Sequence, residues 1–278
     1  MHHRGNLVND IFAFDAYAPK EIAERVETLG VTKARLPLLS QVTLGVLAGG
    51  FIGLGALYFT FITSDASLGF AASRVLGGIA FSLGLILVVV AGAELFTGNN
   101  FLVMAWASGR ISTGELMRNW LVIYFANFAG ALGLALLVFL SQHWQAGGGE
   151  VGANAVKIAY AKAALPFAEA FFKGILCNIL VCLAVWIALA GRSVVDKIFA
   201  IVFPISAFVA AGFEHSVANM YFIPLGILLR DGSHLATAEL LTWAGLLANL
   251  VPVTLGNIFG GGVMVALVYY FVYRHHAR

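Results

Sequence analysis

Two polar stretches interrupt long apolar runs of the chain, and one of them contains the side chain best suited to acid–base chemistry, His215. It lies in the sequence Gly-Phe-Glu-His-Ser-Val-Ala-Asn at 212–219, directly after Glu214. An imidazole changes charge at about pH 6.5, and burying an ionisable group in a bilayer is costly. We therefore expect His215 to lie on a transport pathway. The alternative is a neutral histidine that ties a helix break together with two hydrogen bonds.

The second polar stretch, Gly-Ala-Glu-Leu-Phe-Thr-Gly-Asn at 92–99, repeats the pattern of the first, since both read G-x-E-x-x-x-x-N. Thr97 offers a hydroxyl group to a passing ion, whereas the two glutamates either orient neighbouring groups or cap half-helices. Glycines let the backbone turn at these positions. The residues expected to form the two breaks are Gly92, Glu94, Gly98 and Asn99 in one stretch and Gly212, Glu214 and Asn219 in the other.

The composition indicates that these stretches belong to a membrane protein. Of the 278 residues, 60% are hydrophobic and 11% are charged. About a quarter of the residues in an average soluble domain are charged, so this chain has too few polar side chains to cover a water-facing surface. Its net charge of +2 is too small to indicate a nucleic-acid surface. Cys177 and Cys182 lie in one apolar stretch, which favours buried thiols over a disulfide framework or a metal site.

The hydrophobic pattern predicts an all-α, polytopic membrane protein with six transmembrane helices. A helix needs about 20 apolar residues to cross a bilayer. The second and fifth spans are longer than one crossing requires, and each contains one of the polar stretches, so we expect these two helices to be broken. The predicted spans are 38–63, 75–106, 117–141, 167–190, 197–228 and 246–273.

The order of the motifs indicates an internal repeat. The sequence Asn-Phe-Ala-Gly at 127–130 in the third span corresponds to Asn-Ile-Phe-Gly at 257–260 in the sixth. The two polar stretches likewise correspond in the second and fifth spans. Two halves of three spans each must have opposite orientations in the bilayer, because three is an odd number. Transporters with inverted repeats bind their substrates near the membrane midplane, and we expect the two polar stretches to meet there.

Lysine and arginine predict the orientation of the chain, because they are more frequent in the segments on the same side as both termini. The positive-inside rule then predicts that both termini are cytoplasmic. The expected organisation is an amphipathic N-terminal segment at 1–36, a channel domain at 37–273 and a C-terminal tail at 274–278. The N-terminal segment is polar, so we expect no cleavable signal peptide.

The breaks favour an anion pathway. A broken helix presents free N–H groups and the positive end of a helix dipole, and both attract anions. Lys162 lies at the outer start of the fourth span, where it either snorkels to the interface or collects anions at a mouth. Asn178 is an amide within an apolar helix. A bond from Asn178 to a neighbouring broken helix is favoured over contact with a substrate.

These motifs resemble the signatures of the formate/nitrite transporter family, and the similarity runs from about residue 30 to residue 273. The first motif is Val-Val-Ala-Gly-Ala-Glu-Leu-Phe-Thr-Gly at 89–98. The second is Gly-Ile-Leu-Cys-Asn-Ile-Leu-Val-Cys-Leu-Ala at 174–184, and the third is the stretch at 212–219.

The resemblance implies a homopentamer in the bacterial inner membrane, with an aquaporin-like pore in each protomer. It implies that His215 faces the pore opposite Thr97, that Asn178 is the amide partner of the central site, and that Lys162 is the basic residue of the outer vestibule. It also implies two apolar slits. Their residues would be Phe81 and Phe208 on the periplasmic side, and Leu85 and Leu95 toward the cytoplasm.

We expect the protein to transport small monovalent anions, with formate as the expected cargo, and to link flux to pH through His215. The partners would be the anion, a proton and the lipid bilayer. Nitrite, hydrosulfide or a short carboxylate is the alternative cargo, and a neutral-solute pore would also fit an inverted repeat. A membrane scaffold would not explain two polar breaks. No nucleophile, base and orienting group fall together, so neither enzyme activity nor a cofactor or metal is expected.

Overall fold

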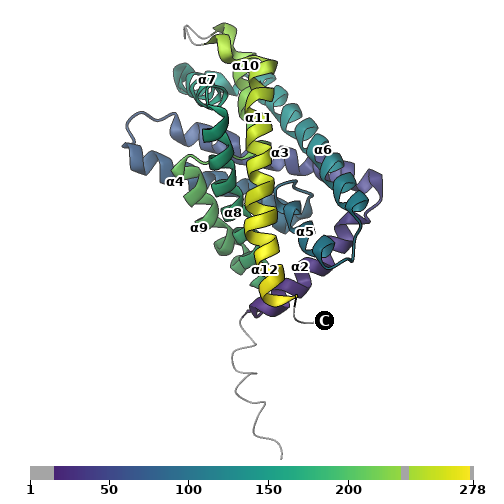
Figure 1. The fold of residues 1–278 in the computed structure, drawn as a ribbon. Helices are drawn as coiled ribbons and strands as arrows, with labels where there is room; N and C mark the ends of the chain where they lie inside the picture. Colours follow the sequence, from purple (N-terminus) through teal and green to yellow (C-terminus); the bar gives the residue numbers. More distant parts are fainter. Residues whose placement is uncertain (1–15, 233–237, 276–278) are drawn as a thin grey trace, which may run out of the picture.

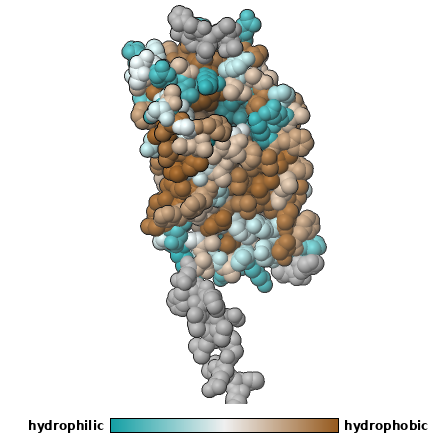
Figure 2. Space-filling view, turned by 90° about the vertical axis from the view of Figure 1, so that its left-hand side faces the viewer, coloured by the Kyte–Doolittle hydropathy of each residue, from teal (hydrophilic) through white to brown (hydrophobic). Residues whose placement is uncertain are grey.

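The computed structural model describes residues 16–232 and 238–275 (Figure 1). All regular secondary structure in this part of the chain is helical. Six of its helices are long and apolar enough to cross a membrane. They are α3 (Leu38–Thr63), α4 with its continuation η1 (Phe70–Gly92), α6 (Thr113–Leu140), α8 (Phe167–Ala190), α9 (Val194–Ala211) and α11 with η6 and α12 (Trp243–Tyr273). The prediction of six spans is confirmed. An apolar belt covers the middle of the face in Figure 2, with hydrophilic residues toward the ends.

The second and fifth spans are interrupted where the polar stretches predict. Helix α4 (Phe70–Ile86) continues into the π-helical turn η1 (Leu87–Gly92), where the second span stops. Helical structure begins again with η2 (Gly98–Phe101) and α5 (Leu102–Ala107). Likewise, α9 stops at Ala211 and α10 (Ser216–Leu229) begins after a four-residue gap. Gly92 and Gly212 have φ angles of 88° and 75°, in the left-handed region that favours glycine.

Each half of the molecule has one more helix than the hydrophobic pattern predicts. Helix α2 (Pro19–Ala34) precedes the first span, and α7 (Glu150–Ala163) precedes the fourth. The first lies within the predicted amphipathic segment, whereas the second was missed. Helix α2 packs on α5 and α7 packs on α10, and Figure 1 shows α2 and α7 at opposite ends of the molecule. The repeat is therefore a three-span unit with an additional amphipathic helix at its start.

The remaining short elements are 3-10 turns in the connections: η3 (His143–Gly149), η4 (Arg230–Gly232) and η5 (Ala238–Leu240). The last helical run of the chain consists of α11 (Trp243–Ile258), the π-helical η6 (Phe259–Leu267) and α12 (Val268–Tyr273). The outer ends of the two predicted terminal segments, residues 1–15 and 276–278, lie outside the described residues.

Glycines let the first and third spans of each half pack backbone against backbone. A Cβ atom at Gly130 of α6 would meet the carbonyl oxygen of Val46 in α3. In the second half, a Cβ atom at Gly260 would meet the carbonyl oxygen of Ile175 in α8. Small residues at such crossings allow close helix association in membranes, where apolar surfaces alone give no driving force. These contacts hold together the frame that carries the two breaks.

Replacement of Gly130 by alanine is expected to lower the thermal unfolding temperature of the protein in detergent, because overpacking typically costs about 1–3 kcal/mol. Gly133→Ala is the matched control in the same helix, since no atom lies within 4 Å of a Cβ atom added there. Equal unfolding temperatures for the two variants would contradict the close α3–α6 contact.

Candidate functional site

His215 and Thr97 join the two breaks. The imidazole is 3% exposed and caps the start of α10, where Nδ1 accepts a hydrogen bond of 3.0 Å from the backbone N–H of Ala218. Nε2 lies 2.9 Å from Oγ1 of Thr97. Because Nδ1 accepts, a neutral ring carries its proton on Nε2 and donates it to Thr97. The threonine hydroxyl hydrogen then points to a different acceptor.

Two cavities approach this pair from opposite sides. The outer cavity, of about 530 Å³, is lined by Phe81, Phe208 and His215. The inner cavity, of about 370 Å³, is lined by Leu85 and Leu95. The residues given as lining the two cavities do not overlap. The four apolar residues implied by the family resemblance thus line the two cavities, two in each.

Aromatic contacts close the outer cavity. The rings of Phe81 and Phe208 meet edge to face, with centroids 5.7 Å apart. The Phe208 ring stacks on the His215 imidazole at 6.1 Å. All three side chains are buried. A hydrated ion would have to shed water to pass this aromatic contact, since apolar constrictions exclude water.

Positive charge collects around the outer cavity. Its lining includes Arg74, Lys157, Lys162 and Lys173, together with the acidic Glu214. The Lys162 ammonium lies 2.8 Å from Oε1 of Glu214 and the Lys173 ammonium lies 2.7 Å from Oε1 of Glu169, so part of the positive charge is neutralised. Clefts lined by one sign of charge raise the local concentration of counter-ions. This cavity is therefore suited to attracting anions.

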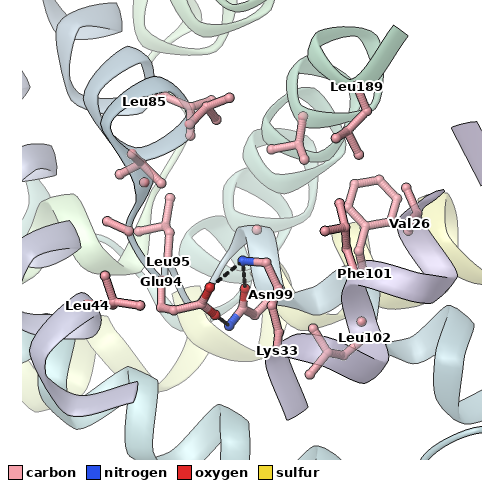
Figure 3. A pocket seen from close by; sticks show the side chains of 18 residues that line it. Val26, Lys33, Leu44, Leu85, Glu94, Leu95, Asn99, Phe101, Leu102 and Leu189 are labelled. Carbon is pink, nitrogen blue, oxygen red and sulfur yellow. Dashed lines mark hydrogen bonds and ion pairs between the residues drawn. The ribbon is translucent and has the colours of Figure 1, made fainter. Parts of the chain in front are cut away.

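Lys33, Glu94, Asn99 and Asn119 form a polar cluster beside the inner cavity, which we call the inner ring. Figure 3 shows Lys33, Glu94 and Asn99. Nζ of Lys33 donates to Oε1 of Glu94 at 2.7 Å and to Oδ1 of Asn99 at 3.1 Å. The Asn99 amide donates to Oε2 of Glu94 at 2.7 Å and to Oδ1 of Asn119 at 3.0 Å. Asn119 donates back to the Lys33 carbonyl at 3.1 Å, which closes the ring.

Lys162, Glu214, Asn219 and Asn249 repeat this arrangement beside the outer cavity and form the outer ring. Nζ of Lys162 donates to Glu214, and the Asn219 amide donates to Oε2 of Glu214 and to Oδ1 of Asn249, both at 2.7 Å. Asn249 donates to the Lys162 carbonyl at 2.9 Å. Sequence analysis missed three members of the two rings. These members are Lys33, Asn119 and Asn249, although Asn119 and Asn249 have the same separation as Asn127 and Asn257.

Asn127 and Asn257 satisfy the backbone at the breaks. The Asn127 amide donates to the carbonyls of Gly45 and Glu94, and its Oδ1 accepts the N–H of Phe96. Asn257 donates to Gly174 and Glu214 and accepts from Ser216 in the same way.

For three amides at the breaks, these contacts correct the expectation of free N–H groups that face an anion. The amides of Phe96, Ser216 and Ala218 all donate to side chains of the protein. Unsatisfied backbone groups are costly inside a bilayer, so the protein supplies its own acceptors. The charged residues that line the outer cavity are one arginine, three lysines and Glu214.

Asn178 lies behind the first break, in neither cavity lining. Its amide donates to Oδ1 of Asn100 and to the Asn257 carbonyl, both at 2.7 Å, and to the Thr97 carbonyl at 3.3 Å. This is the bond to a neighbouring broken helix that the sequence favours. Cys177 and Cys182 are buried free thiols, and Sγ of Cys182 lies 3.7 Å from the Thr97 carbonyl.

Helix α2 covers the inner cavity and is tied to the end of the chain. Glu27 lies 2.7 Å from Nε of Arg274 and 3.5 Å from Nη1 of Arg110. Burial alone would raise the pKa of Glu27, but hydrogen bonds from Ser108 and Arg274 and the two arginine charges together lower it below its ordinary value. The ion pair is therefore intact at neutral pH and is lost only as the pH falls through this lowered pKa.

Comparisons with known proteins agree with this geometry. A family model described as "Formate/nitrite transporter" matches residues 20–271. The chain is 44% identical over 277 residues to "Formate channel FocA" of Escherichia coli (strain K12), covering 94% of this chain and 95% of that protein. It is 38% identical to a "Probable formate transporter" of Methanothermobacter thermautotrophicus, covering 92% of this chain and 97% of that protein.

Solved structures share the fold. A "Pentameric formate channel with formate bound" superposes with a TM-score of 0.79 at 40% identity, covering 85% of this chain and 97% of that chain. A structure described as "FNT family ion channel" gives a TM-score of 0.80 at 31% identity, with coverages of 91% and 98%.

Replacing Lys162 by methionine is expected to destabilise the protein strongly, because removing one partner of a buried ion pair costs about 3–5 kcal/mol. The double variant Lys162→Met/Glu214→Gln should recover most of the loss, since no uncompensated charge remains. The matched variants in the inner ring are Lys33→Met and Lys33→Met/Glu94→Gln. Lys33→Met should lower stability less than Lys162→Met does, because the Lys33 side chain is 30% exposed and that of Lys162 only 15%. Thermal unfolding in detergent measures all four variants. A double variant that is no more stable than the corresponding single lysine variant would contradict the coupling.

Proposed function

The chain belongs to the formate/nitrite transporter family, and from this premise we propose that it carries formate across the cell's cytoplasmic membrane through a pore in each protomer. The observation that supports this most directly is the buried His215–Thr97 pair between the outer and inner cavities. The formate channel of E. coli, which shares 44% of its residues with this chain, supports the same cargo.

The first step is attraction of the anion to the outer cavity by its arginine and lysines. The bare ion stops at Phe81 and Phe208, because transferring an unpaired charge into a low-dielectric slit costs far more than a few kcal/mol. Formic acid crosses such a slit cheaply. For an acid with a pKa of about 4, protonation at pH 7 costs roughly 4 kcal/mol at 1.36 kcal/mol per pH unit. That cost is well below the cost of desolvating the anion.

His215 lowers this barrier through Thr97. The imidazole donates from Nε2 to the threonine oxygen, and the threonine hydroxyl donates to a carboxylate oxygen of the substrate. The carboxylate takes a proton from solvent in the cavity, and the neutral acid then passes Leu85 and Leu95 to the other side. Nδ1 is occupied by the Ala218 N–H, so the role assigned to His215 is that of a hydrogen-bond donor rather than a resident imidazolium.

Asn178 and the two rings act as positioning groups in this proposal. Asn178 holds the Thr97 carbonyl and Asn100 in place. The inner and outer rings hold the backbone of the two breaks. Both cavities carry a lysine, so anions are attracted from either side and the direction of flux follows the gradients of formate and protons.

The assembly proposed for this chain is a homopentamer with both termini in the cytoplasm. The pentameric formate channel of similar fold supports the assembly. The excess of lysine and arginine on the side of the termini supports the orientation.

Formate uptake into proteoliposomes, followed by stopped flow, tests the function. Flux should rise as the external pH falls from 7.5 to 5.5, because protons accompany the anion. A panel with nitrite, acetate and glycerol distinguishes the alternatives. Glycerol permeation without formate flux would indicate a neutral-solute pore, and preference for nitrite would give a different cargo in the same family.

His215→Asn is expected to lower formate flux at least about tenfold, which corresponds to one lost hydrogen bond. Asparagine is a good helix N-cap, so it keeps the acceptor for the Ala218 N–H while losing the donor to Thr97. Thr97→Val should show a similar loss. His215→Ala serves as the comparison that also removes the cap. Full, pH-insensitive formate flux in these variants would refute the role of the pair.

A further inference from the structure

Arg74 bridges the two helices that carry the phenylalanines of the outer slit. It belongs to α4, and its Nε and Nη2 atoms donate to the carbonyls of Ala210 and Val209 at 3.1 and 3.0 Å. These carbonyls lie in the last turn of α9, where the chain breaks at Gly212. The last carbonyls of a helix lack partners within the helix, and a cation near them is favourable. The Val209 carbonyl also accepts the backbone N–H of Gly212 at 3.0 Å. Arg74 therefore caps the end of α9 from the neighbouring helix.

The two ends of this bridge lie close in sequence to the slit. Phe81 follows Arg74 by seven residues in the same helix, two turns along the same face. On the other helix, Phe208 immediately precedes Val209, whose carbonyl accepts the guanidinium. A shift of the α9 terminus relative to α4 therefore moves one phenylalanine against the other, whose ring centroids are 5.7 Å apart.

The glycine of the break makes room for this bridge. A Cβ atom at Gly212 would lie 2.9 Å from Nη2 of Arg74. The guanidinium also lies over the face of Phe59, with Cζ 5.9 Å from the ring centroid. The guanidinium is thus held by two carbonyls and a ring.

The inner slit lacks the equivalent bridge. Glu94 and Glu214 are separated by 120 residues, and the same offset relates Arg74 to Val194. Val194 is an apolar residue that is 54% exposed. Among the described residues, the position that corresponds to Arg74 in the second half therefore carries no brace, although the frame around it is repeated.

We propose that Arg74 is a positioning residue that sets the width of the outer slit and thereby limits the size of the carboxylic acids that pass. The inference rests on the proposed formate pathway. If Arg74 only collected anions, lysine could replace it without loss of function. If Arg74 positions the slit, lysine cannot replace it. Lysine at this position keeps the charge, but its ammonium is a point charge and cannot span two carbonyls in the fork geometry of arginine.

The experiment compares permeation of propionate and formate in proteoliposomes containing the full chain with Arg74→Leu, Arg74→Lys or Arg74→Gln. The ratio of propionate to formate permeability should rise about three- to tenfold in all three variants, as expected for the loss of a charge-assisted hydrogen-bond brace. The lysine variant should keep the ionic-strength dependence of the parent. Size-exclusion profiles and unfolding temperatures check that the variants are folded. If the leucine variant aggregates, the permeability ratios of the lysine and glutamine variants decide the test.

Lys157→Leu is the matched control, because Lys157 lines the same cavity but lies on α7 rather than on a helix of the slit. It should weaken the ionic-strength dependence and leave the permeability ratio unchanged. A parental ratio in the lysine variant, with equal loss of both acids in the leucine variant, would mean that Arg74 only collects anions and would overturn the proposal. A parent protein that carries no formate would instead refute the proposed function.

Discussion

The need to satisfy backbone and charged groups inside the bilayer governs this structure. A helix broken in hydrocarbon exposes N–H and C=O groups that water cannot reach. Here Asn127 and Asn257 bind the backbone of the two breaks. The inner and outer rings each add a lysine–glutamate pair whose second carboxylate oxygen accepts a hydrogen bond from an asparagine amide. The pathway exists because these buried polar clusters make two non-helical segments tolerable in the same membrane.

The frame is symmetric, but the chemistry at its centre is not. Glu94 and Glu214 are 120 residues apart. At the same offset, His215 corresponds to Leu95, and Thr97 corresponds to Val217. One half thus provides the imidazole and the other provides the hydroxyl, and each corresponding position is apolar. A symmetric centre would have the same side chain at both corresponding positions, and so either two imidazoles or none. The inverted repeat gives both halves the same backbone frame. The two halves differ in the side chains at a few corresponding positions, and these differences create the His215–Thr97 pair.

Much of the architecture follows from local sequence. Six spans and both breaks could be predicted because hydropathy and glycine content act over short windows. His215 and Thr97 could be singled out because polar residues within apolar runs are costly. Helix α7 was missed because an amphipathic helix between two spans has no hydrophobic run of its own. The expectation of free amides was wrong for Phe96 and Ser216 because their acceptors, Asn127 and Asn257, lie on other helices.

The sequence by itself determined that the protein crosses the membrane six times, that two of its helices are broken and which polar residues lie at the breaks. Only the tertiary structure decided what those residues contact. Lys33 meets Glu94 across 61 positions of sequence, and Arg74 reaches α9 across more than twice that separation. Hydropathy is a property of each short segment, whereas a hydrogen bond depends on the packing of helices that are distant in the chain.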